Sequence, residues 1–249
     1  MIQSVDRALR ILMALQDERL LGVSDLANRL GLAKGTVHGL LQTLAARSMV
    51  EQDPASGKYM LGPALLVMGN VYLNSHDLRV RSLHWVTSLA DTTGLAVRLA
   101  VLVWPDVVIV HHVAASDATI PVSEVGLGMP AHATALGKAI LAFHPDRVRL
   151  LGDEPLSRLT GSTITDPAEL LAGLKSVAEA GSAVESQEAV VGETEVAGAI
   201  FDRGGSVIGA VSAVLPSTDP PPESVVAGVR ETARAISREL GAPTWPIPA

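Results

Sequence analysis

The 249-residue chain contains no cysteine and few aromatic residues. Without thiols it cannot form disulfides, thiolate metal sites or a nucleophilic-cysteine active site. Aromatic side chains make up only 3% of the sequence against a hydrophobic fraction of 48%, so Leu, Val, Ile and Ala must form most of the core. This length and composition predict a folded protein with two domains, one of which can be small.

Long hydrophobic runs and catalytic motifs are also missing. No stretch of about 18 apolar residues could span a bilayer, and the N-terminus lacks the charged and apolar regions of a signal peptide. We therefore expect a cytoplasmic protein with no membrane partner. The chain has no Gly-x-Ser-x-Gly or His-Glu-x-x-His motif, and Gly137-Lys138 precedes alanine where a phosphate loop needs a hydroxyl. No enzymatic activity and no cofactor is predicted, although missing motifs alone do not exclude an enzyme.

One cluster of histidines, formed by His111, His112 and His132, could suggest a metal site. Adjacent residues of a strand point to opposite faces of a sheet, so His111 and His112 cannot both bind one ion without distortion. We therefore predict no metal site and expect His132 to form a hydrogen bond within the fold. Residues 126–130 are glycine-rich and are interpreted as a loop at the edge of a pocket.

Charge is distributed unevenly along the chain. The net charge is −7, yet residues 1–60 hold seven basic and six acidic side chains, so this segment carries +1 and the remainder −8. A small DNA-facing domain attached to an acidic domain would show this difference, although many two-domain proteins show one of this size by chance.

Hydrophobic spacing predicts three helices near the N-terminus. The first, over residues 4–16, is expected to bury four side chains: Val5, Leu9, Leu12 and Leu15. The second covers residues 24–31, with Ser24 as its cap and Gly31 at its end. A turn and a third helix over residues 34–44 follow, so the second and third helices form a helix-turn-helix candidate. Two strand-like runs at residues 49–52 and 58–61 flank a turn and predict a β-hairpin, the wing of such a domain.

The rest of the chain predicts an α+β domain behind a linker. Residues 63–94 show helical spacing broken at 74–77, where Ser75 and Asp77 could cap a new helix. Strand patterns follow at 96–104, 107–113, 197–202 and 207–214, with two helices in between and a last amphipathic helix before a Pro-rich tail. Asp166, Pro167 and Glu169 announce the second of these helices. We accordingly predict a DNA-binding domain at 1–62, a linker helix at 63–94 and an α+β domain at 95–249, which the family resemblance given below implies to be an effector-binding domain.

The third helix and the hairpin carry side chains suited to nucleic acid. Lys34 and Thr36 lie at the start of that helix, where side chains and backbone N–H groups can hold phosphate, and Gln42 could read adenine. The predicted DNA-binding residues are Lys34, Thr36, His38, Gln42, Thr43 and Lys58. A helical hairpin with a solvated polar face is the alternative, which the adjoining hairpin makes less favourable.

Five stretches of the chain match a known family: SVDRAL at 4–9, LGLAKGTVH at 30–38, GKYMLG at 57–62, PAHATALGK at 130–138 and TITDP at 163–167. In these stretches the chain resembles the IclR-type transcription regulators. Within the family, residues 31–41 and 51–61 look most like the glycerol-operon regulators of actinomycetes, which share a glycine at the position of Gly39. The resemblance covers nearly the whole chain. It implies a winged helix-turn-helix and a GAF-like effector domain, with a curved antiparallel sheet flanked by helices. It also implies a homodimer or dimer of dimers on a roughly palindromic double-stranded DNA operator.

The resemblance also implies an effector pocket between the sheet and the segment that begins at Pro130. Its lining, carried over by position, would be Ala135, Leu136, Glu185, Glu195 and Ser212. Relatives that bind small carboxylates have cysteine at the Glu195 position and serine at the Val214 position. A carboxylate there disfavours an anionic ligand, so a polyol, an amine or another neutral ligand fits better than a simple 2-oxo acid. The alternative is that Glu185 and Glu195 are ordinary exposed residues at strand ends.

The chain is therefore interpreted as a ligand-responsive, DNA-binding transcription regulator, a repressor of a catabolic operon such as one for glycerol utilisation. One alternative is a small-molecule domain with enzymatic activity, in which Glu185 and Glu195 act as acid and base beside an accessory helical module. A third interpretation is a protein that only dimerises.

Overall fold

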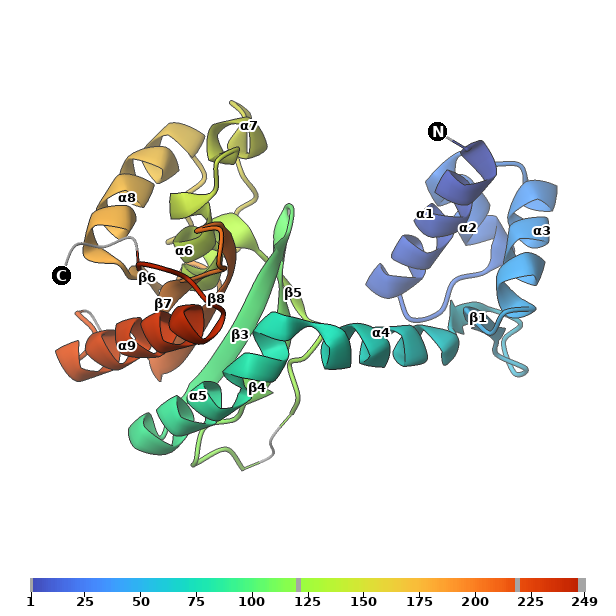
Figure 1. Cartoon of the computed structure of the whole chain (residues 1–249). Coiled ribbons are helices and arrows are strands. Elements are labelled where there is room, and N and C mark those ends of the chain that lie inside the picture. The colour runs from blue at the N-terminus through green and yellow to red at the C-terminus, as the bar shows by residue number, and fades with distance from the viewer. Residues whose placement is uncertain (1, 120–121, 218–219, 246–249) are drawn as a thin grey trace. The chain divides into compact units, whose positions relative to one another are not determined.

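The computed structural model describes residues 2–119, 122–217 and 220–245. It divides the chain into two compact units, Met1–Ser75 and His76–Ala249. Figure 1 shows the first unit as helices with a small hairpin, and the second as a sheet with helices packed against it. Among the described residues, no helix is long and apolar enough to cross a membrane.

The first unit contains the predicted helix-turn-helix. Its three helices are α1 (Gln3–Asp17), α2 (Val23–Leu30) and α3 (Lys34–Ala45). Gly31 ends α2 in the left-handed conformation, with a φ of +67°, as predicted. The predicted cap is wrong, because α2 begins two residues earlier: Gly22 is the N-cap and its N–H donates to Asp25 Oδ2 at 3.0 Å, while Ser24 lies inside the helix.

The predicted burial of α1 is only partly correct. Ile11, Ala14 and Leu15 form its buried face, whereas the side chains of Val5 and Leu9 are 54% and 52% exposed. Spacing alone identifies an apolar helix but cannot say which of two apolar stripes the neighbouring helices cover. The second stripe of α1 is therefore left uncovered within the described residues.

The wing is present as the predicted hairpin. Strands β1 (Val50–Gln52) and β2 (Tyr59–Leu61) pair antiparallel, with Gln52 opposite Tyr59. Gly57 takes a φ of +68° in the connecting turn, a conformation that glycine adopts readily. Tyr59 also pairs with Leu21, which fixes the hairpin to the start of α2.

The predicted break in the linker separates the two units. Helix α4 (Ala64–Ser75) belongs to the first unit, and α5 (Asp77–Thr93) belongs to the second, where Leu78, Val86 and Leu89 are buried. The predicted caps are wrong: His76 is the N-cap of α5 and its side chain makes no capping bond to the helix, and the Ser75 hydroxyl donates back to Val71 O at 2.8 Å.

The second unit is built on a six-stranded antiparallel sheet in the order β5-β4-β3-β8-β7-β6. Its strands are β3 (Ala96–Val103), β4 (Asp106–Val113), β5 (Gly128–Pro130), β6 (Ala183–Ser186), β7 (Glu193–Phe201) and β8 (Val207–Pro216). The four longer strands were predicted, whereas β6 was not. Residues 126–130 were predicted to be a loop, but Gly128 to Pro130 pair with β4 and form β5.

Helices cover both faces of this sheet (Figure 1). On one face, a Cβ added at Gly198 would lie 2.8 Å from Ala233 Cβ of α9 (Glu223–Glu239), and one at Gly209 2.5 Å from Leu78 Cδ2 of α5. The other face packs against α6 (Ala135–Phe143), which follows the 3-10 turn η1 (Ala131–Ala133). Beyond α6 lie α7 (Arg147–Leu151) and α8 (Pro167–Ala180), and Asp166 caps α8 as predicted, accepting a bond from Ala168 N at 2.8 Å.

Candidate DNA-binding and effector-binding sites

One face of α3 is polar and open to solvent. Val37 and Leu41 are buried in the core of the first unit, whereas Lys34, His38 and Gln42 are exposed at intervals of one helical turn. Within the described part of the chain, no hydrogen bond or ion pair engages these three side chains. A Cβ added at Gly35 or Gly39 would have no atom within 4 Å. Without side chains at these two positions, the backbone of α3 is accessible to a partner.

Three other predicted DNA-binding residues occupy different surroundings. Thr36 is half-buried, and Lys58 is exposed where β2 begins. In the turn before Lys58, two hydrogen bonds from Ser56 lower the pKa of Asp53, so the wing tip keeps a negative charge beside its lysine. The Thr43 hydroxyl donates to Gly39 O at 2.9 Å.

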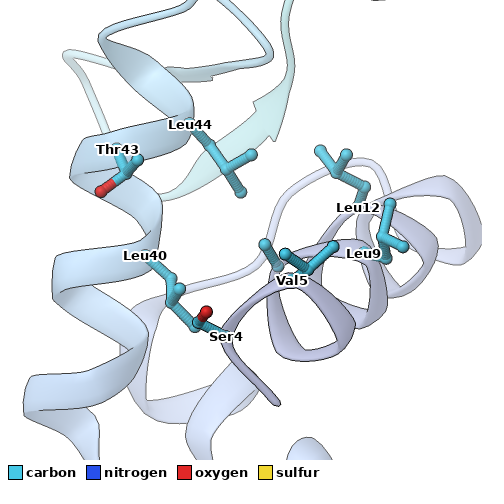
Figure 2. A pocket seen from close by; sticks show the side chains of 8 residues that line it. Ser4, Val5, Leu9, Leu12, Leu40, Thr43 and Leu44 are labelled. Atoms are coloured by element: carbon cyan, nitrogen blue, oxygen red, sulfur yellow. The ribbon is translucent and has the colours of Figure 1, made fainter. Parts of the chain in front are cut away.

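Thr43 also lines an apolar groove between α1 and α3 (Figure 2). Its walls are Ser4, Val5, Ala8, Leu9 and Leu12 from α1, and Leu40, Thr43 and Leu44 from α3. The groove continues the exposed stripe of α1, so apolar surface extends from one helix to the other.

Strand register places three of the predicted effector residues, Glu185, Glu195 and Ser212, on one face of the sheet. Glu185 pairs with Glu195, Ala197 with Ser212, and Ser212 with Arg98. Cross-strand partners lie on the same face of a sheet, and so do alternate residues of one strand. The side chains on this face, which point toward α6, are those of Glu185, Glu195, Ala197, Ser212 and Arg98. The structure thus brings Ala135, Leu136, Glu185, Glu195 and Ser212 together.

Glu195 lies at the centre of this group. Its Oε2 accepts the N–H of Ala135 at 2.9 Å and that of Leu136 at 3.5 Å, while its Oε1 accepts the Ser212 hydroxyl at 2.7 Å. Arg98 Nη1 lies 3.6 Å from the same Oε1. Only 2% of Glu195 is exposed, and 3% of Glu185, so the interpretation of both as exposed strand-end residues is wrong.

Arg98 joins three carboxylates around this centre. It forms two hydrogen bonds to Glu124, at 2.6 and 3.0 Å, and lies 3.8 Å from Glu193. Burial opposes its charge, but the bond to Glu124 and the carboxylates of Glu195 and Glu193 outweigh burial and raise the pKa of the guanidinium. Burial also raises the pKa of Glu193, with Arg98 opposing and the other carboxylates adding to this shift.

A second ion pair lies beside Glu185. The ammonium of Lys138 on α6 bonds to Glu188 Oε1, and Glu188 N donates to Glu185 Oε2 at 2.8 Å. Burial raises the pKa of Glu185 to about 7, the Glu188 N–H opposes this, and the charges of Glu195 and Glu188 add to it. This carboxyl therefore keeps its proton to a higher pH than an ordinary glutamate does.

The sequence did not identify the charged partners of this site. Arg98 interrupts an otherwise apolar strand, AVRLAVLV, and Lys138 interrupts an apolar helix, ALGKAILAF. A charged residue in such a run signals a buried ion pair. The carboxylate partners Glu124, Glu188 and Glu193 could not be chosen without the strand register.

The histidines serve other roles. His132 Nε2 lies 2.8 Å from Ser157 O, so the predicted hydrogen bond within the fold is confirmed. His111 is opposite Leu99 and His112 is opposite Arg98 in the pairing of β4 with β3. His112 Nε2 lies 4.0 Å from Glu124 Oε2. Across the described ranges, no three His, Asp or Glu side chains are grouped so as to hold a metal ion.

Comparison with known proteins identifies the family. The model of the IclR helix-turn-helix domain matches residues 4–54, and that of the C-terminal region of the bacterial transcriptional regulator IclR matches residues 70–238. Over 247 residues, 97% of each chain, the sequence is 42% identical to a Streptomyces griseus protein named glycerol operon regulatory protein.

Solved structures agree with this match over the whole chain. An IclR-type transcriptional regulator from Silicibacter sp. TM1040 superposes with a TM-score of 0.84 at 26% identity, covering 99% of this chain and 100% of that one. An IclR homologue from Microbacterium hydrocarbonoxydans, solved with 4-hydroxybenzoate, gives 0.76 at 27% identity, covering 95% and 98%. The chain therefore belongs to the IclR family of bacterial transcriptional regulators.

Proposed function

We propose that this regulator is a dimeric repressor of a catabolic operon of the glycerol-utilisation type, whose affinity for operator DNA changes when a small molecule binds its C-terminal domain. The polar face of α3 carries the first part of this proposal. Lys34 at the helix start suits phosphate, and His38 and Gln42, one and two turns further, suit base edges in the major groove. Thr36, Thr43 and Lys58 complete the proposed DNA-binding set. Acting on DNA, the protein would work in the cytoplasm.

The effector site is proposed at the buried polar group between α6 and the sheet. Ala135, Leu136, Glu185, Glu195 and Ser212 meet there, with Arg98 and Lys138 beside them. Buried charges are costly and are seldom retained for stability alone, so such a group in an apolar core is a candidate ligand site. The relative crystallised with 4-hydroxybenzoate supports a small-molecule ligand.

Two uncovered apolar surfaces of the first unit support association with a second copy. Helix α1 exposes Val5, Leu9 and Met13, and none of the twelve residues of α4, all of them described, is buried. Exposed apolar side chains in such numbers mark an interface in a protein that stays in solution. A symmetric dimer would present two copies of α3 to the two halves of a palindromic operator.

Effector binding and DNA binding are coupled, in this proposal, through the dimer. A ligand with different affinities for two dimer arrangements shifts the population between them and so changes the spacing of the two α3 helices. The glycerol operon is proposed because the relative at 42% identity bears that name. The enzyme alternative is less favourable, because Glu195 would have to act as acid or base while its oxygens accept bonds from Ala135 and Ser212.

The proposal is tested by fluorescence anisotropy with the DNA upstream of the protein's own gene, at two salt concentrations. Binding that is tighter than to unrelated DNA of the same length and that weakens steeply with salt is expected. Equal and salt-insensitive binding to both DNAs would contradict it.

A further inference from the structure

Helices α5 and α9 pack side by side on the sheet face opposite α6 (Figure 1), and a groove of about 340 Å³ lies between them. This volume is within the range of small-molecule sites. The helices run antiparallel along the groove, because Trp85 Nε1 donates to Glu239 Oε2 at 2.6 Å and a Cβ added at Gly228 would lie 3.3 Å from Leu89 Cδ1. The groove is therefore separate from the proposed effector site, which lies on the other face.

Two hydroxyls that line the groove have no hydrogen-bond partner among the described residues. They belong to Ser88 and Thr232. The other hydroxyls of α5 and the one near the end of α9 donate to the carbonyl four residues earlier in their helix, as such side chains commonly do: Ser82, Thr87, Thr92, Thr93 and Ser237. Thr232 is only 8% exposed, so its hydroxyl is costly to leave unpaired unless the groove supplies a partner.

The rim of the groove carries one charge of each sign. Glu231 and Arg238 are both exposed, and neither forms an ion pair with another residue that the structure describes. They are two helical turns apart on α9, which is about 10 Å along the helix axis. With the helices antiparallel, Trp85 lies toward Arg238 and Thr92 toward Glu231, so the two ends of the groove differ in chemistry.

The end of the groove nearest Glu231 offers acceptors. Thr92 donates its hydroxyl proton to Ser88 O at 2.7 Å, so its oxygen can only accept from the groove. The Glu231 carboxylate accepts as well, and the Thr232 hydroxyl is free to do so. Three acceptors around one position suit an ammonium group, which has three N–H donors and no acceptor.

The end nearest Arg238 offers donors, and the stretch in between is apolar. The guanidinium of Arg238 suits a carboxylate, which it can bind through two parallel hydrogen bonds. Trp85, Leu89 and Ala235 line the intervening stretch, and the bond from Trp85 to Glu239 holds the indole in place. A fixed indole beside aliphatic side chains suits a flat ring.

We infer that this groove is a second small-molecule site, which takes a rigid zwitterion with an aromatic body between a carboxylate and an ammonium group. The carboxylate pairs with Arg238, the ammonium with Glu231, Thr92 and Thr232, and the ring lies along Trp85. A ligand with a single charge satisfies only one end. The inference rests on neither the operator nor the effector proposed above.

The test is isothermal titration calorimetry of the full chain, without DNA, with 4-(aminomethyl)benzoate and two analogues that each lack one charge, 4-methylbenzoate and 4-methylbenzylamine. The zwitterion is expected to bind roughly three- to tenfold more tightly than either analogue, since each analogue loses one charge-assisted contact at a partly exposed site. Equal affinities for all three compounds, or no binding of the zwitterion, would overturn the inference.

Variants assign the two ends separately. Arg238→Gln should weaken binding of the zwitterion and of 4-methylbenzoate but not of 4-methylbenzylamine, and Glu231→Gln should do the reverse. Thr232→Val should weaken binding of the two amines, and Thr232→Ser, which keeps the hydroxyl, should restore it. Lys175→Gln and Glu179→Gln, the same changes of charge on exposed positions of α8, are the controls and should alter none of these affinities.

The indole N–H signals of the ¹⁵N-labelled protein locate the bound compound. The chain has three tryptophans, and Trp104 and Trp245 pack on the core beside α6. The zwitterion should shift the Trp85 signal, which is identified by its loss in Trp85→Phe. A shift confined to Trp104 or Trp245 would place the compound on the other face and overturn the inference. So would a change of oligomeric state in Arg238→Gln, because a second copy would then cover the groove.

Discussion

Glu195 Oε2 lies 2.9 Å from the backbone nitrogen of Ala135, and this bond joins residues 60 apart in the sequence. It ties β7 to the first turn of α6, so the position of that helix on the sheet depends on a buried charge. A molecule that changes the surroundings of Glu195 would therefore act on the contact between helix and sheet.

Ser212→Ala should weaken this contact. The Ser212 hydroxyl donates to Glu195 Oε1 at 2.7 Å in a fully buried position, so its loss leaves a carboxylate oxygen short of a donor. We expect a loss of about 1–3 kcal/mol in the free energy of unfolding, measured by urea denaturation. Ser206→Ala, at an exposed turn, is the control and should change it little. Equal effects of the two substitutions would argue against a buried bond at Ser212.

The stability of the second unit should depend on the protonation of Glu185. Its pKa is raised from 4.5 to about 7 in the folded protein, so between these values the folded state holds a proton that the unfolded state releases. The free energy of unfolding should then fall as pH rises through this window, by up to about 3 kcal/mol.

The matched variant for this pH dependence is Glu185→Gln, which cannot ionise. Glu193 also has a raised pKa, and Glu188, Glu195 and Lys138 surround Glu185, so the quantity to compare is the difference between the two proteins. The wild-type curve should fall more steeply from pH 5 to 7 than the variant curve. Parallel curves would show that Glu185 titrates normally.

Two glycines in helices should respond in opposite directions to alanine. A Cβ at Gly137 would lie 2.0 Å from Ala131 O and force α6 away from η1, at a cost of about 2–4 kcal/mol. Gly173 in α8 has open space around it, so Gly173→Ala should stabilise the protein by roughly 0.5–1 kcal/mol. Thermal unfolding of the two variants checks both signs, and a stable Gly137→Ala would refute the close packing of α6.

Lys34→Ala should weaken binding to operator DNA in the way expected for the loss of one phosphate contact. The side chain is exposed at the start of α3, so affinity should fall by a similar factor on every DNA sequence, and the slope of log Kd against log salt should decrease by about 1. Lys175→Ala, an equal change of charge on exposed α8, should leave both quantities unchanged. A loss for both variants alike would indicate a nonspecific charge effect.

A charge on the uncovered stripe of α1 should weaken self-association. Leu9→Glu places a carboxylate among exposed apolar side chains and should raise the dissociation constant of the dimer at least about tenfold, measured by sedimentation equilibrium. Val148→Glu changes another exposed apolar residue, in the second unit, and serves as control. Monomeric wild type, or an unaffected Leu9→Glu, would contradict the proposed interface.

Much of this architecture could be predicted from local patterns. The winged helix-turn-helix, the four longer strands and the α8 cap at Asp166 follow from helical spacing, alternation and capping chemistry, and the family resemblance is confirmed. Strand β6 was missed because four residues at a sheet edge, AVES, carry too little pattern. The exposure of Val5 and Leu9 depends on which stripe neighbouring helices cover, which periodicity does not contain.

The ion pairs of the site could not be predicted from local sequence patterns either. Glu195 and Ser212 were chosen by position in the family, but their bond, and those of Arg98 to Glu124, join segments brought together only by the sheet. Sequence indicates that a buried arginine needs a partner. Which carboxylate supplies it is decided by register and loop path.

The most direct measurement is the Kd of the full chain for the DNA upstream of its own gene, followed by fluorescence anisotropy as glycerol is added. Parallel titrations use glycerol 3-phosphate and a panel of aromatic and 2-oxo acids. If the two units form one ligand-responsive regulator of the proposed specificity, glycerol should change this Kd by a factor of about 5–150, and the acids should change it less. A Kd that no compound alters, or one that only the acids alter, would contradict it.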